Sequence, residues 1–167
     1  MKGALYRFLS DDHERLDKLL DQAASKVEVI DPGSYAEFRK GLLRHISMEE
    51  KTILPAIARM QGGKPALMAE RIRLDHGALV ALLVPPPTPS IILTLRSILK
   101  VHNDFEEKDE GLYQMLEQLS EEEAEKLLLQ LKSVPEVPVL PHNERPAALE
   151  AARRAVQRAG YEFLDIT

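Results

Sequence analysis

Two short stretches of this chain, HISMEEK and HNDFEEK, place a histidine and a glutamate four residues apart. An α-helix turns about 100° per residue, so side chains four residues apart project from the same face. His45 and Glu49 would therefore share one helix face, and His102 and Glu106 would share another. Imidazole nitrogens and carboxylate oxygens suit iron, zinc and manganese. The spacing thus predicts that each stretch offers two ligands to a metal ion.

A second pair of segments repeats a different pattern. DDHERLDKLL and LDHGALVALL share Asp-His-x-x-Leu-x-x-Leu-Leu, which contains His13 and His76. The two kinds of segment alternate along the chain, so their order indicates two helical hairpins of similar design. Two such hairpins packed face to face form a four-helix bundle, and side chains from facing helices then meet in its core.

The histidines and glutamates of these segments fall on the apolar faces of their helices; Leu42 and Ile46, for example, flank His45. A buried unpaired carboxylate costs several kcal/mol, and two facing carboxylates repel each other. No lysine or arginine in these stripes is placed to neutralise both carboxylates, so divalent cations are expected to do so.

A simpler alternative exists for each residue taken alone. One histidine on an apolar face is more often a hydrogen-bonded core residue, and a single His-x-x-x-Glu pair is a weak signal. Four helices that each contribute a histidine at a matching level favour the metal site over this alternative. The fifth histidine, His142, lies among prolines in VLPHNERP, where an exposed loop is expected, and it is left out of the site.

The composition is that of one soluble, helical domain. Apolar residues make up 44% and charged residues 29% of the 167 residues, and aromatics only 5%. The formal net charge of −5 argues against a nucleic-acid partner, which would need a basic face. The absence of cysteine excludes disulfides and thiolate metal sites. No apolar run resembles a signal peptide or a membrane span, so a cytoplasmic location without membrane partners is expected.

Proline, glycine and serine divide the chain into helices. Ser10 either caps the first helix or lies within a longer one. Pro55 should bend the second helix, because proline lacks the N–H that the helical ladder needs. The helices are expected at 11–26, 34–60 with Ser34 as cap, 65–83, 91–119 with Ser90 as cap, 120–133 with a Ser120/Glu123 capping box, and 146–160 after an extended connector that starts at Val134.

The ordered set of motifs resembles the hemerythrin-like, or HHE cation-binding, domain over about residues 5–119. It consists of His13, His45-x-x-x-Glu49, His76 and His102-x-x-x-Glu106. The resemblance implies an all-α fold: an up-down-up-down four-helix bundle at 1–120, with the short helix, proline-rich connector and C-terminal helix of 121–167 packing on it or extending from it. Ferritin-like bundles use Glu-x-x-His motifs instead, and these fit the sequence poorly.

The resemblance also implies a centre of two non-haem irons, with zinc and manganese left open as the native metal. His13 and His45 would bind one iron, His76 and His102 the other, and Glu49 and Glu106 would bridge the two. An oxo or hydroxo group would complete the bridge.

The sequence departs from oxygen-carrying hemerythrins at two points. Val80 stands where those proteins have a second histidine on the third helix, which leaves one metal with an open position. Their fourth-helix aspartate is replaced by Glu106 or Glu107, and helix geometry favours Glu106. Around the site, Asp12 and Asp75 either orient ligand imidazoles or are exposed acids at helix starts.

Glu50 and Glu107 are expected to be solvated. Spacing places Tyr113 near the face of the site, but packing alone accounts for it. Three functions follow from the motifs, in decreasing order of preference. The first is a di-iron protein that senses or binds O₂, NO or peroxide, or that handles iron. The second is a di-iron enzyme that reduces peroxide or O₂ or repairs iron centres; whether the chain is an enzyme stays open. The third is a zinc-pinned scaffold that interacts through its surface. A homodimer is left open.

Overall fold

The computed structural model describes residues 2–26, 29–64 and 67–166, and over these ranges the chain is all-helical. Within those ranges, β-type pairing is confined to one isolated antiparallel bridge between Lys26 and Val29. None of the described helices combines the length and the apolar character that crossing a membrane requires.

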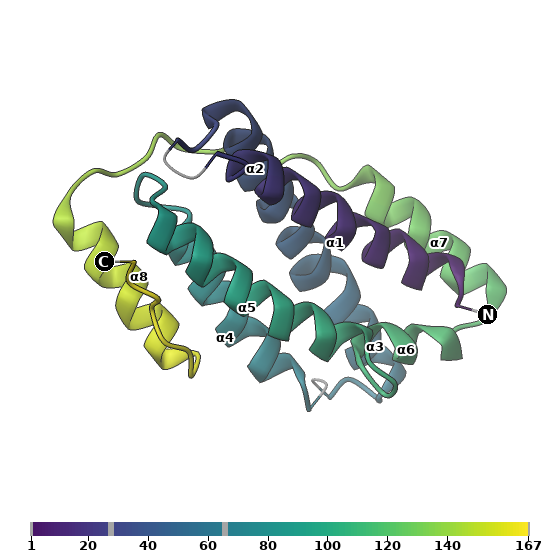
Figure 1. Cartoon of the computed structure of the whole chain (residues 1–167). Helices are drawn as coiled ribbons and strands as arrows, with labels where there is room; N and C mark the ends of the chain where they lie inside the picture. The colour runs from purple at the N-terminus through teal and green to yellow at the C-terminus, as the bar shows by residue number, and fades with distance from the viewer. Residues whose placement is uncertain (1, 27–28, 65–66, 167) are drawn as a thin grey trace.

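Four long helical segments run side by side, and the chain reverses direction from each to the next (Figure 1). α1 packs on α2, α4 packs on α5, and α1 also packs on α5. The helices are α1 (Ala4–Ala23), α2 (Pro32–Met48), α3 (Leu54–Met60), α4 (Ala69–Leu82), α5 (Pro89–Glu107), α6 (Leu112–Met115), α7 (Glu121–Ser133) and α8 (Pro146–Arg158). A π-helical turn, Glu49–Ile53, joins α2 to α3, and a 3₁₀ turn, Leu116–Gln118, follows α6.

The bend expected near Pro55 is present in the structure as a π-helical turn. Pro55 is the second residue of α3 and has no N–H to donate to the preceding turn. The wider π turn directly before it accommodates this loss. Glu49 is the first residue of the π turn, so the local distortion coincides with a candidate ligand.

The predicted caps of α2 and α5 are wrong. Asp31 caps α2, with its side chain accepting a hydrogen bond from the Ser34 N–H at 2.7 Å. Thr88 caps α5 in the same way rather than Ser90. In both cases a proline follows the cap and is the first helical residue, where a missing N–H is tolerated, so the helix starts earlier than expected.

The expected helix 91–119 is also wrong, because α5 ends at Glu107 and the chain turns back. Glu110 adopts a left-handed conformation, with φ of 66°. Gly111 passes so close to α5 that a Cβ there would lie 2.5 Å from the carbonyl oxygen of Glu106. Only glycine permits this approach, and it directs the following residues toward the interior.

The first helix, expected at 11–26, instead runs from Ala4 to Ala23, because its buried apolar face already begins at Leu5. Other predicted features agree with the structure. Ser10 lies within a longer α1, the Ser120/Glu123 capping box is present, and Gly160, with φ of 87°, follows α8. Residues 134–143 form a helix-free connector. The expected start of the third helix at Pro65 lies outside the described residues; the described helix begins at Ala69.

Two apolar clusters fill the interior, and the candidate ligands lie between them. One cluster contains Leu16, Leu42 and Leu99, and the other contains Leu9 and Ile72. Along each helix the candidate histidine falls between residues of the two clusters, as His13 does between Leu9 and Leu16 on α1. The polar side chains therefore form one layer across the apolar core.

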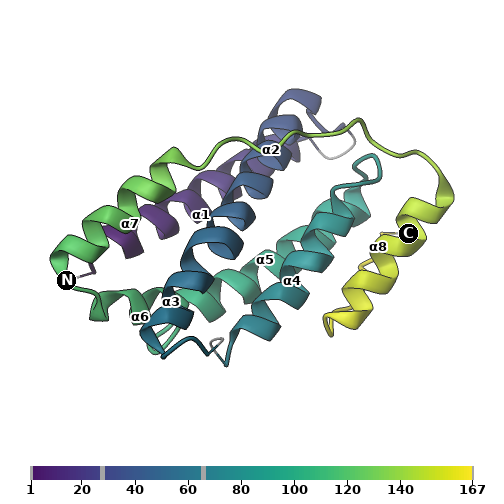
Figure 2. The ribbon, with the colours of Figure 1, turned by 180° about the vertical axis from the view of Figure 1, so that it is seen from behind.

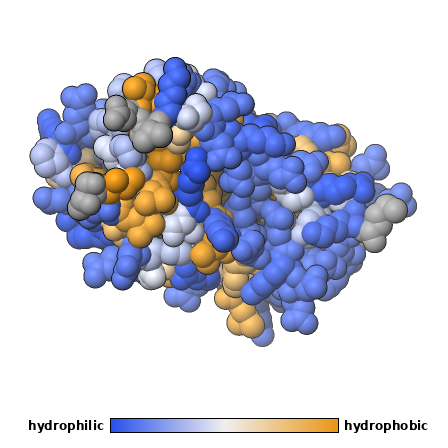
Figure 3. Space-filling model, viewed as in Figure 1, coloured by the Kyte–Doolittle hydropathy of each residue, from blue (hydrophilic) through white to orange (hydrophobic). Residues whose placement is uncertain are grey.

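The C-terminal elements cover the outside of these helices. α7 packs on α1 and α8 packs on α4, as the view from behind also shows (Figure 2). The last residues are tied to α5, where Thr94 Oγ1 accepts from the Leu164 N–H at 2.9 Å. Hydrophilic residues dominate the viewed surface, with a smaller apolar area where α5 begins (Figure 3); there Leu93 is exposed.

Candidate metal centre

The structure brings all six predicted ligands together in the polar layer. His13 lies on α1, His45 on α2, His76 on α4, and His102 with Glu106 on α5, while Glu49 lies in the π turn. Both glutamates are completely buried, and none of the four histidines is more than 4% exposed. Their proximity agrees with the prediction from spacing; their role as ligands stays a prediction.

Each glutamate divides its two oxygens between two histidines of different hairpins. The nitrogen–oxygen distances are 3.2 Å for His45 Nε2–Glu49 Oε1, 3.0 Å for His76 Nε2–Glu49 Oε2, 3.4 Å for His13 Nε2–Glu106 Oε2, and 3.3 Å for His102 Nε2–Glu106 Oε1. The two carboxylates thus span the space between one pair of histidines and the other.

Two groups of donor atoms result, and they share the glutamates. Each group contains two histidines and both carboxylates, and its donor atoms all lie within 4.8 Å of one another. Nitrogen and oxygen donors in this number suit a divalent transition metal. The groups are His13, His45, Glu49 and Glu106, and Glu49, His76, His102 and Glu106.

A carboxylate lies against the outer nitrogen of every one of the four histidines. The Nδ1–oxygen distances are 2.6 Å for His13–Glu107, 2.8 Å for His45–Asp12, 2.7 Å for His76–Glu50 and 3.2 Å for His102–Asp75. An Nδ1–H that donates to a carboxylate leaves the Nε2 lone pair directed at the interior. Metal-binding histidines commonly have such a partner, which fixes the tautomer and the orientation of the ring.

These outer carboxylates decide two open points of the sequence interpretation. Asp12 and Asp75 orient imidazoles, and Asp75 is only 1% exposed. The expectation that Glu50 and Glu107 are simply solvated is wrong, because each bonds a histidine of the other hairpin. The Glu-Glu pairs in the repeated motifs could have indicated these contacts. In each pair the first glutamate points inward, and the second reaches sideways to a histidine of a neighbouring helix.

Charge compensation inside the layer is visible in the pKa values. Burial disfavours protonation of His45, but Glu49 and Asp12 outweigh it and raise the pKa of His45 to about 10. Burial opposes protonation of His76 as well, and Glu49 with Glu50 raises its pKa to about 9. Although burial alone would raise the pKa of Glu49, the two histidines hold it well below the ordinary value. Without a metal, protonated His45 and His76 thus balance the charge of Glu49.

Among the six candidate ligands, one buried oxygen has no hydrogen-bond partner. Glu106 Oε1 accepts none, although His102 Nε2 lies 3.3 Å away, because the geometry between the two groups is unsuitable. An unsatisfied buried carboxylate oxygen is unfavourable and rare in native proteins. A cation between Glu106 and His102 would satisfy this oxygen, so the residues present fit a metal ion.

Tyr113 is a member of the layer, so the expectation that packing alone accounts for it is wrong. Its completely buried hydroxyl lies 2.5 Å from Glu49 Oε1, to which it donates, and 3.1 Å from Glu106 Oε2. His13 Nε2 and His45 Nε2 lie 3.0 and 3.3 Å from the same hydroxyl. Burial, followed by the charges of Glu106 and Glu49, raises the pKa of Tyr113 well above its ordinary value. The reversal of the chain after α5 places Tyr113 in the polar layer, and the helical periodicity of the sequence does not predict that turn.

Val80, which stands where a second histidine of the third helix was considered, does not extend into the site. Val80 is 37% exposed and lies on the outer side of α4. A small cavity of about 10 Å³ is lined by His13, His45, His102 and apolar side chains. A space of this size holds about one water-sized molecule. A hollow of about 410 Å³ on the surface is lined by His13 and Glu107, so it leads from solvent to the edge of the layer.

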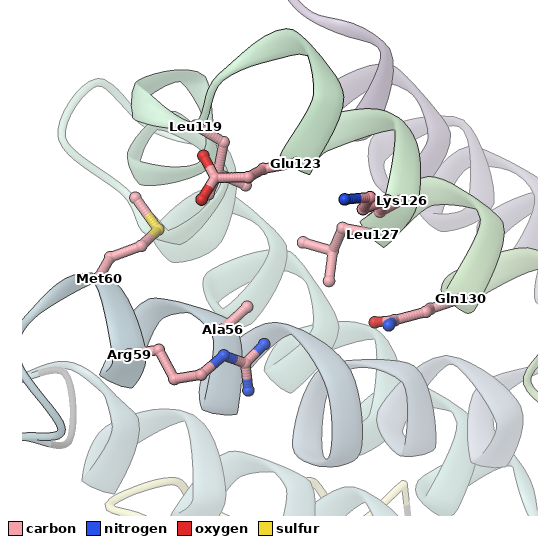
Figure 4. A pocket seen from close by; sticks show the side chains of 8 residues that line it. All are labelled: Ala56, Arg59, Met60, Leu119, Glu123, Lys126, Leu127 and Gln130. Carbon is pink, nitrogen blue, oxygen red and sulfur yellow. The ribbon is translucent and has the colours of Figure 1, made fainter.

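A hollow of about 390 Å³ between α3 and α7 is separate from the candidate ligands (Figure 4). Ala56 and Leu127 contribute apolar surface to it, and Arg59 and Lys126 contribute charged groups.

His142, excluded from the site by sequence, is half-buried in the connector and stacks on the ring of Tyr35.

Comparison of the chain with protein-family models, with curated proteins and with solved structures yields no match.

Proposed function

We propose that this chain is a hemerythrin-like protein whose four long helical segments form an up-down-up-down bundle around two non-haem iron ions. The observation that carries the proposal is the division of each glutamate between two histidine pairs. A carboxylate placed in this way can bind one metal through each oxygen, and its charge offsets theirs. Two helical hairpins that supply equivalent ligands agree with the repeated sequence pattern.

In this proposal His13 and His45 hold one metal, His76 and His102 hold the other, and Glu49 and Glu106 bridge them. The outer carboxylates hold all four Nε2 atoms toward the interior, so the rings are oriented before a metal arrives, and the metal takes the place of the Nε2 protons of His45 and His76. Histidine and carboxylate donors without thiolates favour iron, manganese or zinc. We select iron because of the motif resemblance.

A bound iron pair would supply redox chemistry and coordination positions for small ligands. The chain contributes a buried surround, with a cavity of about 10 Å³ next to three histidines. Only a molecule of a few atoms fits this space. We therefore propose that the protein binds or senses a small ligand such as O₂, NO or peroxide.

The test is the metal content per chain of protein purified without added metal, with visible and near-ultraviolet spectra recorded before and after exposure to air. Two irons per chain and an oxo-bridge charge-transfer band are expected. The double variant Glu49→Gln/Glu106→Gln should lose the paired metals. Glu125→Gln is the matched control, because Glu125 is an exposed glutamate far from the layer in sequence.

Two outcomes would overturn the proposal. Retention of two metals per chain by the double variant would show that the glutamates are not bridging ligands. A single zinc, or an unchanged fold and no metal at all, would show that the polar layer serves the scaffold.

A further inference from the structure

We infer that the phenol oxygen of Tyr113 is a fifth protein ligand of the metal bound by His13 and His45. This inference rests on the proposed metal centre and makes its two halves chemically different. The sequence motifs describe two equivalent halves, each with two histidines and two shared carboxylates, and they do not include a tyrosine.

The distances around the hydroxyl carry the inference. Tyr113 Oη lies between 2.5 and 3.3 Å from four donor atoms of the first half: His13 Nε2, His45 Nε2, Glu49 Oε1 and Glu106 Oε2. Two ligands that bind one metal at right angles with bonds of about 2.1 Å lie roughly 3.0 Å apart. The hydroxyl is therefore spaced from its neighbours as one more ligand around a common metal would be.

Hydrogen bonding alone does not account for this arrangement once a metal is present. A phenol has one hydrogen, and Tyr113 donates it to Glu49. A metal that takes the Nε2 lone pairs of His13 and His45 removes their contacts with the hydroxyl. The phenol oxygen then lies beside a cation with lone pairs free to bind it, on a side chain that is completely buried.

The position of the ring is firmly determined. The ring of Tyr113 stacks on His13 at 5.5 Å and meets the edge of Tyr6 at 5.8 Å, measured between ring centroids. Gly111, two residues before Tyr113, approaches α5 closely and is the N-cap of α6. This contact fixes where α6 begins. The hydroxyl is thus placed by the packing of its ring on α1 and by the close turn between α5 and α6, as a metal ligand requires.

Among the described residues, no tyrosine makes the corresponding contacts with His76 and His102. The metal of that half would have two histidines and two shared carboxylates as protein ligands and would keep the open positions. His102 of this half lines the cavity of about 10 Å³ together with His13 and His45, so an added small anion or neutral ligand in that cavity should bind the second metal, which keeps open positions, rather than the first.

Binding of the phenol is a ligand exchange without redox change, in which a water molecule bound to the entering metal leaves and the phenolate oxygen takes its place. The O–H bond of Tyr113 breaks, a bond from the phenolate oxygen to the metal forms, and the proton leaves to solvent. The oxidation state of the metal is unaltered, so zinc should support the same exchange as iron.

The experiment uses the full chain loaded with Fe(III). Ferric phenolate complexes absorb visible light, and resonance Raman excitation in that band enhances the ring and C–O vibrations of the bound tyrosine. We expect both signals from the unaltered protein and from Tyr35→Phe, and neither from Tyr113→Phe. Tyr35 is the matched control, because it is equally buried, lies in the other apolar cluster and has a hydroxyl without a hydrogen-bond partner.

A second measurement needs no variant. Titration of the metal-free, unaltered protein with Zn²⁺ should produce the near-ultraviolet difference absorbance of one tyrosinate per chain. Two bound metals without phenolate vibrations and without the tyrosinate signal would overturn the inference and leave the proposed centre standing. Absence of paired metal binding would instead overturn the proposed function.

Discussion

The metal-free protein should lose stability as the pH rises from 6.5 to 10. The pKa of His45 in the folded protein is about 10 and that of His76 about 9, against an ordinary value of 6.5. A group whose pKa is raised by folding stabilises the folded state fully below its unfolded pKa, and this stabilisation is lost as the pH rises through the folded pKa. The loss should therefore fall between pH 6.5 and 10.

The magnitude follows from the same values. A tenfold difference in proton affinity between the folded and unfolded states corresponds to about 1.4 kcal/mol, so His45 alone would contribute about 5 kcal/mol and His76 about 3 kcal/mol. Because both histidines face Glu49, their contributions overlap, and we expect a total loss of about 3–5 kcal/mol. That is a large part of the roughly 5–15 kcal/mol that stabilises a typical domain.

The assay is urea unfolding followed by circular dichroism, at several pH values between 6 and 10, on protein freed of metal by a chelator. Metal-loaded protein is the comparison, because a metal that takes the Nε2 lone pairs leaves the histidines neutral and should flatten the dependence. Metal-free stability that stays constant or rises over this interval would refute the account of charge compensation in the polar layer.

Three further predictions concern single positions. Gly111→Ala should destabilise the protein by about 1–3 kcal/mol in urea unfolding, because the added Cβ would meet the Glu106 carbonyl. The same change should weaken the visible ferric phenolate band. Gly77→Ala is the control, since Gly77 has open space around it, and should be neutral or slightly stabilising. Asp75→Asn should lower metal affinity about 10–100-fold in competition with a chelator, because His102 loses its charged partner; an unchanged affinity would contradict that role. Ser120→Ala should cost about 1 kcal/mol in thermal unfolding without changing metal content, because the capping box of α7 is lost.

Helical periodicity in the sequence was enough to assign the six candidate ligands to helix faces. The pairs His45/Glu49 and His102/Glu106 share a face in any α-helix, whatever surrounds it, because residues four apart lie about one turn apart. Their position among apolar residues then predicts burial, and the alternation of the two motifs predicts two hairpins. The all-helical structure and the common polar layer agree with these expectations.

The environment of the ligands depended on contacts between distant parts of the chain. Glu50 reaches His76 and Glu107 reaches His13 across helix interfaces, so neither contact follows from local spacing. Tyr113 enters the layer only because the chain turns back after Glu107, where the close approach of Gly111 to α5 matters more than the continuing apolar pattern. Local geometry thus determined which helix faces the ligands occupy. Tertiary packing decided which carboxylates orient the histidines and that the hydroxyl of Tyr113 lies among the ligands.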